Sequence, residues 1–304
     1  STGFASTVGA TEPIGDGTGA AITLNGTGGV TFAGAVVTAN GITQAESAGE
    51  VTFQENLTIT SAETATAFNG DVTLEGLVLT SAGALTFGNG AGDQLTIDTG
   101  PVQITTETAE ADQTYNASIQ GPQQLQIATG PADSGGAAVF ANLIGDGTAL
   151  QALTVNAGGG ITFFGSAVQT NGSQQYVTPT TAGAAPVLVQ GAGSGIAFTA
   201  GTTIAATDLH IDLAGGSSAT MSVSAGTDVT ITQDLVLLSG ELDVSNQTVS
   251  VGRDLVLLGQ DYRDDDPDWD GDQGGGPDGD IGLAYDDDDR FIYPNWARLK
   301  YDGG

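Results

Sequence analysis

The chain contains no cysteine, and its first 252 residues contain neither lysine nor arginine. Without cysteine the fold cannot depend on disulfides or on metal sites built from thiolates. The formal net charge is −31, and all five basic residues lie in the last fifth of the chain: Arg253, Arg263, Arg290, Arg298 and Lys300. A nucleic-acid partner needs a basic surface that neutralises phosphates, and anionic lipid head groups repel an acidic one. We therefore expect no nucleic-acid partner.

Long hydrophobic runs are also missing. No stretch approaches the roughly 20 apolar residues of a membrane-spanning helix, and Ser1 does not open a signal-peptide pattern. We expect no direct membrane insertion, and we expect that any export signal has been removed. What the chain does contain is 48 glycines and 39% hydrophobic residues, mostly small or β-branched, which favour sheet over helix.

Similar segments recur along the chain. The segment GDGTGAAITLNGTGGVTFAGAVVTANG from Gly15 to Gly41 has a close counterpart in GDGTALQALTVNAGGGITFFGSAVQTNG from Gly145 to Gly172. Shorter units, each a short strand, a glycine or asparagine turn and another short strand, begin near Gly83, Gly193 and Gly226. A unit this small cannot bury its apolar face alone, so repetition favours a solenoid of stacked turns over a sandwich.

Apolar residues alternate with threonine within these units, as expected for strands with one buried face. The triplets include Val30-Thr31-Phe32, Val72-Thr73-Leu74, Leu95-Thr96-Ile97, Leu153-Thr154-Val155 and Val229-Thr230-Ile231. No stretch has helical periodicity. We predict an all-β fold from about residue 15 to 258, with these side chains pointing into the core: Phe32, Phe87, Leu153, Phe163 and Ile231.

The repeat phrasing resembles the passenger regions of large bacterial surface proteins of the filamentous haemagglutinin and autotransporter adhesin type. The resemblance rests on residues 149–168 and 81–97, on the phrase at 113–116 and on the phrase at 67–74. It implies a right-handed parallel β-helix, secretion, and a role in adhesion, biofilm or cell-surface architecture. The secretion domains of that family are not seen here, which leaves open a fragment or a processed subunit.

The composition changes near residue 258, where we place the boundary between a repeat region, 1–258, and an acidic C-terminal segment, 259–304. The sequence DPDWDGD from Asp266 to Asp272 matches the opening of a calcium loop, in which oxygens two residues apart converge on one ion. Pro277 stands where an EF-hand has its bidentate glutamate, so the site is not a regular EF-hand. The predicted Ca²⁺ ligands are Asp264, Asp266, Asp268, Asp270, Asp272, Asp278 and Asp280. The alternative is a solvated acidic linker.

The last residues, 291–301, gather aromatic and basic side chains in a chain that has few of either. One interpretation is a docking segment, because aromatics and arginine are enriched at interface hot spots. The other is a cap over the last turn, which solenoids require at their ends.

The sequence offers few residues that point to catalysis. The only histidine, His210, lies in an alternating strand, and a triad would need a nucleophile and an acid placed around it. Asp208 and Asp212 are the candidates for a pair of glycosidase carboxylates. A lyase generally needs a basic residue, and residues 1–252 offer no lysine or arginine for that role. Ice binding by an array of threonines is a further alternative, although the triplets are irregularly spaced.

The sequence therefore predicts a non-enzymatic, extracellular structural or adhesive surface protein. We expect it to be stabilised by calcium and to associate with copies of itself or with other cell-surface components. The alternative function is that of a polysaccharide-degrading β-helix enzyme.

Overall fold

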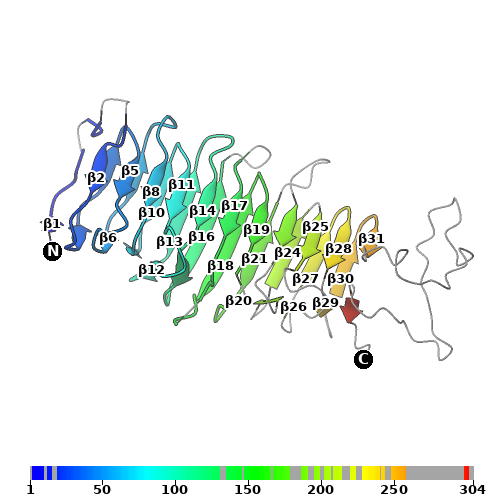
Figure 1. Cartoon of the computed structure of the whole chain (residues 1–304). Coiled ribbons are helices and arrows are strands. Elements are labelled where there is room, and N and C mark those ends of the chain that lie inside the picture. Colours follow the sequence, from blue (N-terminus) through cyan, green and yellow to red (C-terminus); the bar gives the residue numbers. More distant parts are fainter. Residues whose placement is uncertain are drawn as a thin grey trace, which may run out of the picture.

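The computed structural model shows an elongated rod of short stacked strands (Figure 1). It describes residues 2–9, 12–15, 19–130, 135–145, 147–165, 167–178, 186–190, 195–198, 202–206, 208–213, 220–223, 228–239, 241–243, 248–257 and 298–300. The described residues contain no helix. Accordingly, none of them forms a helix long and apolar enough to cross a membrane.

The strands form three parallel sheets, which we name A, B and C. Sheet A contains β1 (Thr2–Phe4), β3 (Val30–Phe32), β6 (Val51–Phe53), β9 (Val72–Glu75), β12 (Gln94–Asp98) and β15 (Ser118–Gln120). Single bridges through Ile144 continue it into β20 (Ala167–Val168), β23 (Gly195–Phe198), β26 (Thr220–Val223), β29 (Glu241–Asp243) and β32 (Arg298–Lys300).

Sheet B has 10 strands: β4 (Val36–Thr38), β7 (Leu57–Ile59), β10 (Val78–Ser81), β13 (Val102–Thr106), β16 (Gln124–Thr129), β18 (Ala152–Ala157), β21 (Gln174–Val177), β24 (Thr202–Ala206), β27 (Asp228–Ile231) and β30 (Thr248–Val251). Sheet C has 11: β2 (Ile22–Leu24), β5 (Ile42–Gln44), β8 (Thr66–Phe68), β11 (Leu85–Phe87), β14 (Gln113–Tyr115), β17 (Ala138–Phe140), β19 (Ile161–Phe163), β22 (Val187–Val189), β25 (Leu209–Asp212), β28 (Leu235–Ser239) and β31 (Leu255–Leu257).

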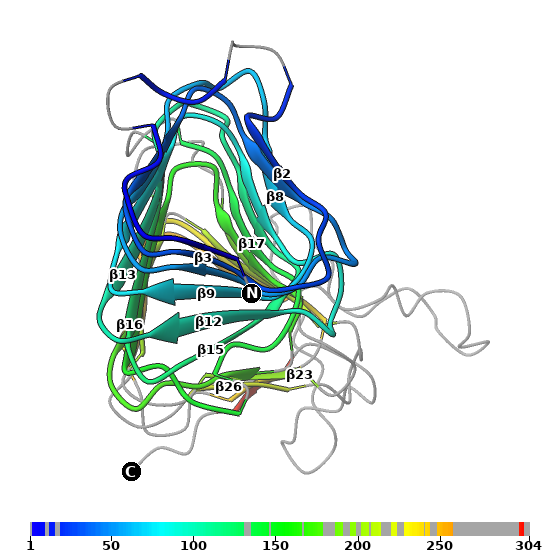
Figure 2. The same ribbon diagram turned by 90° about the vertical axis from the view of Figure 1, so that its left-hand side faces the viewer.

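The chain visits the sheets in the fixed order A, B, C, so each turn adds one strand to each face of a triangular rod (Figure 2). Every pairing between named strands is parallel, as between β6 and β9. Seen from the end that carries the N terminus, the chain runs clockwise as it recedes, with β9 leading toward sheet B. This is a right-handed turn, the hand that parallel crossovers favour. The predicted right-handed parallel β-helix is confirmed.

Alternation of side chains sets the inside and outside of each strand. In β6 the side chains of Val51 and Phe53 are buried, whereas Thr52 between them faces outward and is half-buried. The same pattern repeats in most described strands, because successive residues of a strand point to opposite faces. The five predicted core residues are all confirmed, with no more than 1% of each side chain exposed: Phe32, Phe87, Leu153, Phe163 and Ile231.

Aromatic rings stack from turn to turn inside the rod. In sheet A, Phe4, Phe32 and Phe53 have ring centroids 5.0 Å apart. The column then moves to sheet C, where rings on successive turns lie 5.0–5.4 Å apart: Phe68, Phe87, Tyr115, Phe140 and Phe163. Such offset pairs contribute on the order of 0.5–1.5 kcal/mol each beyond the burial of their area.

The hydroxyls of two buried tyrosines are satisfied by glutamines two residues earlier in the same strand. The hydroxyl of Tyr115 donates to Oε1 of Gln113 at 2.6 Å, and Nε2 of Gln113 donates to the carbonyl of Ala128 at 2.7 Å. The hydroxyl of Tyr176 donates to Oε1 of Gln174 at 2.9 Å. Burial raises the pKa of both tyrosines well above the ordinary value, so both stay neutral.

The duplicated segments lie on different faces of the rod. In the first copy, residues 22–24, 30–32 and 36–38 lie in sheets C, A and B. In the second copy, the corresponding strands β18, β19 and β20 lie in sheets B, C and A. Each strand has therefore moved by one face, which shows that the three faces accept the same sequence pattern.

Strand β31 ends at Leu257, and residues 258–297 lie outside the described part. Strand β32, within the predicted segment 259–304, pairs with β29 and so extends sheet A of the solenoid. Its register sets Arg298 opposite Glu241 and Lys300 opposite Asp243. The boundary itself stays a prediction.

Glycine is required where the backbones of two adjacent turns of the solenoid lie in close contact. Gly121 has a φ of +131°, and a Cβ at this position would lie 2.0 Å from the carbonyl oxygen of Ile97. We expect Gly121→Ala to lower the free energy of unfolding by on the order of 2 kcal/mol or more, since backbone strain and overlap add. The matched control is Gly90→Ala, because a Cβ there has no atom within 4 Å. Equal denaturation midpoints for the two variants would contradict this packing.

Candidate functional site

The predicted calcium site lies outside the described residues. This holds for all seven predicted ligands: Asp264, Asp266, Asp268, Asp270, Asp272, Asp278 and Asp280. Within the described part, no group of three or more histidine or acidic side chains is placed to hold a metal ion. Calcium binding by residues 264–280 therefore stays a prediction.

The outer face of sheet A carries a column of threonines in register. Thr31, Thr52, Thr73 and Thr96 follow one another on successive turns, and Gln120 comes next. Adjacent strands are about 4.8 Å apart, so these side chains form a regular row. The irregular spacing of the triplets along the sequence thus becomes a regular spacing on the surface, because the turns between them differ in length.

Carboxylates flank this threonine row. Oε1 of Glu50 accepts a hydrogen bond from the Thr73 hydroxyl at 2.6 Å, and Oδ1 of Asp71 accepts one from the backbone N–H of Gln94 at 3.0 Å. On the other side of the row, Nε2 of Gln54 donates to Oε2 of Glu75 at 3.0 Å. The acidic groups are thus held by neighbouring turns at fixed places on the face.

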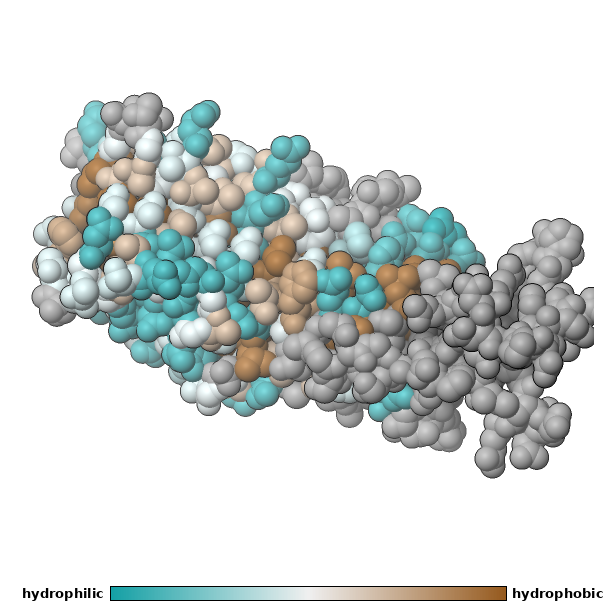
Figure 3. Space-filling view, in the orientation of Figure 1, coloured by the Kyte–Doolittle hydropathy of each residue, from teal (hydrophilic) through white to brown (hydrophobic). Residues whose placement is uncertain are grey.

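The outer column of sheet C changes character along the rod. Toward the N-terminal end it carries Thr23, Thr43, Thr86 and Thr114, with Ala67 among them. Toward the C-terminal end the column becomes mainly apolar: Val139, Thr162, Leu188, His210, Val236 and Val256. Figure 3 shows the corresponding change from pale surface to brown patches separated by teal residues. The two halves of the rod therefore offer different surfaces to a partner.

The candidate catalytic residues lie in and directly before strand β25. His210 is on the outer face of sheet C, where its register neighbours are the aliphatic Leu188 and Val236. Asp208 occupies the turn before β25, and its Oδ1 accepts a hydrogen bond from the backbone N–H of Asp234 at 3.0 Å. Asp212 ends β25 and follows the buried Ile211.

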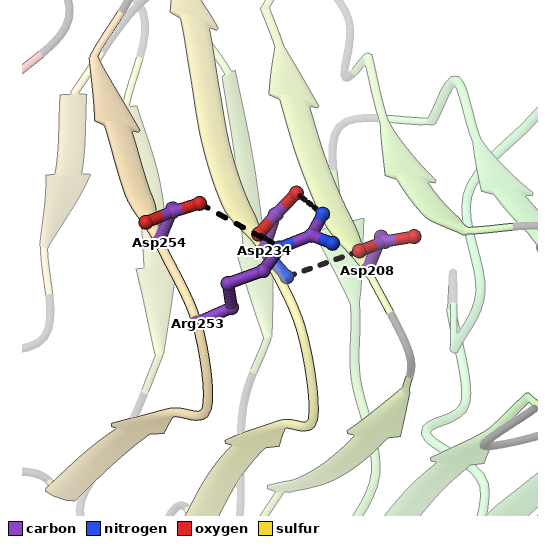
Figure 4. Close-up of polar contacts among 4 residues, drawn as sticks. All are labelled: Asp208, Asp234, Arg253 and Asp254. Carbon is purple, nitrogen blue, oxygen red and sulfur yellow. Dashed lines mark hydrogen bonds and ion pairs between the residues drawn. The ribbon is translucent and has the colours of Figure 1, made fainter. Parts of the chain in front are cut away.

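Three aspartates stack beside Arg253, at the turns that precede three consecutive strands of sheet C (Figure 4). Nε of Arg253 donates to Oδ1 of Asp234 at 2.7 Å, and the terminal NH2 group donates to Oδ2 of the same carboxylate. Nε also lies 3.6 Å from Oδ2 of Asp254. The aspartate that precedes each strand is visible as the repeated pair Asp-Leu at 208–209, 234–235 and 254–255, a signal that the sequence-based predictions missed.

This pairing sets the ionisation of Asp234. Hydrogen bonds from Arg253 lower the pKa of Asp234 below its ordinary value, and the pKa of Arg253 is raised in return. Because the folded pKa of the carboxyl is lowered, the pair stabilises the fold above the unfolded pKa, about 3.9, and this stabilisation is lost as the pH falls through the folded value. The Arg253 side chain is 56% exposed and the Asp234 side chain 19%, so solvent screens the pair and its contribution is small.

A shallow cleft of about 300 Å³ lies at the ends of β16, β18 and β21. Its lining consists of Ala128, Thr129, Gly130, Asn156, Ala157, Gly158, Val177 and Thr178, none of which is ionisable. The hydroxyl of Thr178 is buried there without a hydrogen-bond partner. Hydrolysis of a glycosidic bond uses two carboxyl groups about 5–10 Å apart, and this lining provides neither.

Comparison with protein families, with curated proteins and with solved structures finds no match for this chain. The fold alone defines the class of this protein, which is a right-handed parallel β-solenoid with three faces.

We predict that Arg253→Gln raises the pKa of Asp234 toward its ordinary value, because the neutral amide no longer favours the carboxylate. The measurement is an NMR titration of the side-chain carboxyl carbons. Asp254→Asn is the control, since it removes only the more distant carboxylate and should leave Asp234 hydrogen-bonded to Arg253. An unchanged pKa of Asp234 in the Arg253 variant would contradict the pairing.

Proposed function

We propose that this protein is an extracellular structural or adhesive element of a bacterial surface. The observation that supports this most is the combination of a rigid three-faced rod with in-register outer columns of threonine and carboxylate. Side chains repeated at the spacing of adjacent strands suit binding to extended or repetitive partners. They do not suit a reaction at one point.

The excess of acidic over basic residues supports the same proposal. Residues 1–252 contain no lysine or arginine, and the net charge of −31 keeps a glycine-rich β protein soluble and disfavours contact with nucleic acid or anionic lipid. An absence of lysine and arginine also removes the cleavage sites of trypsin-like proteases over this length. A surface exposed to extracellular proteases benefits from that.

Calcium is the proposed cofactor, bound within residues 264–280. Carboxylates packed this densely repel one another unless a cation lies between them, so the ion selects an ordered state. Other copies of this acidic protein, or other acidic components of the surface, would then meet less electrostatic repulsion as they approach.

We propose that the C-terminal segment 281–304 acts at the end of the solenoid, as a cap or as a docking segment. The pairing of β32 with β29 supports the capping role, because Arg298 and Lys300 extend sheet A opposite two acidic residues. The docking role of the aromatic and basic residues at 291–301 stays a second proposal.

The proposed location is tested by treating intact producing cells with proteinase K and, separately, with trypsin, followed by immunoblotting. We expect proteinase K to remove the protein and trypsin to leave a large fragment, since residues 1–252 lack lysine and arginine. Deletion of the gene should reduce cell adhesion or matrix formation. Protection from both proteases until the cells are lysed would overturn the extracellular proposal.

For calcium, we expect isothermal titration calorimetry to show binding of at least one ion, and chelation to speed proteolysis of residues 264–280. Replacing Asp266, Asp268 and Asp270 together by asparagine should remove most of the binding heat. The matched control replaces Asp286, Asp287 and Asp288 by asparagine, which lowers the charge equally outside the proposed loop. No binding above background by the unaltered chain would refute the calcium site.

A further inference from the structure

The two ends of the rod expose side chains that every internal turn buries. At the first turn, Phe4 stacks on Phe32 in register, yet 42% of Phe4 is exposed and only 1% of Phe32. At the last turn, Leu255 continues the inward column of Leu235, yet 37% of Leu255 is exposed and only 1% of Leu235. Each exposed side chain is an inward residue with a turn on one side only.

These side chains belong to all three sheets at the first turn and to sheets B and C at the last turn. We define the first-turn face by Phe4 in sheet A, by Val8 and Ile14, which bridge to sheet B, and by Ile22 and Leu24 in sheet C. We define the last-turn face by Val249 and Val251 in sheet B and by Leu255 in sheet C. Apart from Val30, all the partly buried hydrophobic residues that pack against the described core belong to these two faces.

Two of the three sheets match at the two faces as adjacent turns do. Sheet C ends in β31 and begins in β2, and sheet B ends in β30 and begins at Val8 and Ile14, so the last turn of one rod placed on the first turn of another would repeat the parallel pairing found inside the rod. In sheet A, β32 occupies the place beside β29 that β1 of the next rod would take, so β32 must leave β29 for all three sheets to continue. The outer edges of β1 and β31 have no strand partner in the described part, and unpaired edges favour such additions.

Acidic side chains lie at both ends. The last-turn end carries Asp234 and Asp254 beside Arg253, and Glu241 and Asp243 in β29, and the first turn contributes Glu12. Like charge on the rest of the chain opposes any contact, so screening by salt should strengthen association.

We propose that a second copy of this chain stacks head to tail, with the last-turn face of one rod on the first-turn face of the next. The inference rests on the proposed structural role and names the partner and the surfaces that such a role uses. It is a heterologous contact, which extends into a filament unless something blocks one face.

The test uses four full-length variants of matched exposure. Phe4→Asp blocks the first-turn face and Leu255→Asp the last-turn face. Phe164→Asp and Val78→Asp place the same charge at side chains that are 40% and 39% exposed away from the two faces. Sedimentation velocity and electron microscopy, in low salt and in about 1 M salt, where the screening length falls to about 3 Å, report the size distribution.

We expect the unaltered chain and both control variants to form rods longer than one molecule, more so in high salt. Phe4→Asp and Leu255→Asp should each remain monomeric. Mixed one to one, these two variants should form a dimer and grow no further, because each supplies the face that the other lacks.

Three results would overturn head-to-tail stacking: an unaltered chain that stays monomeric in both salts, end-face variants that assemble like the controls, or a mixture in which no dimer forms. Dimers formed by one end-face variant alone would indicate a symmetric contact between like faces. Circular dichroism checks folding, and Ile14→Asp, on the same face but in another sheet, replaces Phe4→Asp if that variant unfolds. The location assay on cells is independent: a surface protein that stays monomeric would overturn stacking alone, and an intracellular one that stacks would overturn the proposed function alone.

Discussion

The structure depends on the stacking of each turn on its neighbours. A turn of three short strands encloses too little volume for a core of its own, so its inward side chains are covered only by the turns before and after it. Parallel backbone hydrogen bonds and the aromatic column from Phe4 to Phe163 both run along the rod and connect one turn to the next. Internal turns have this support on both sides. Within the described part of the chain, the first turn and strands β30 and β31 have it on one side only, which is why Phe4 and Leu255 are partly exposed.

The same constraint leaves the residue types at the outward positions free to vary. Since stability comes from the inward columns, the outward positions can carry any side chain that suits a pleated surface, and here they carry threonine, carboxylate and, toward the C-terminal end of sheet C, aliphatic residues. The turns differ in length, yet adjacent strands stay in register, so residues irregularly spaced in sequence form regular rows. A rod of this kind acts through its surface and its ends, and both proposals made for it concern those places.

Much of the fold follows from local patterns, and the rest depends on information that local patterns do not hold. Alternation in triplets such as Val30-Thr31-Phe32 identifies strands and their buried side chains, and glycine and asparagine mark the turns. The face that a strand joins cannot be read in this way, because the three faces are equivalent, and the duplicated segments occupy different faces for that reason. Arg253 meets Asp234 only because one turn separates them in space. A cap over the last turn is one of two interpretations of residues 291–301, but the pairing of β32 with β29 and its register cannot be read from local sequence patterns.

Native-state hydrogen exchange of single amides tests the central claim most directly, because it measures the free energy of opening turn by turn. If neighbouring turns supply the stability, protection should be highest in the middle of the rod, in strands such as β12 to β18, and should fall steadily toward β2 at one end and β31 at the other. Equal protection in all turns, or strong protection confined to one end, would show that individual turns are stable without their neighbours and would contradict this account.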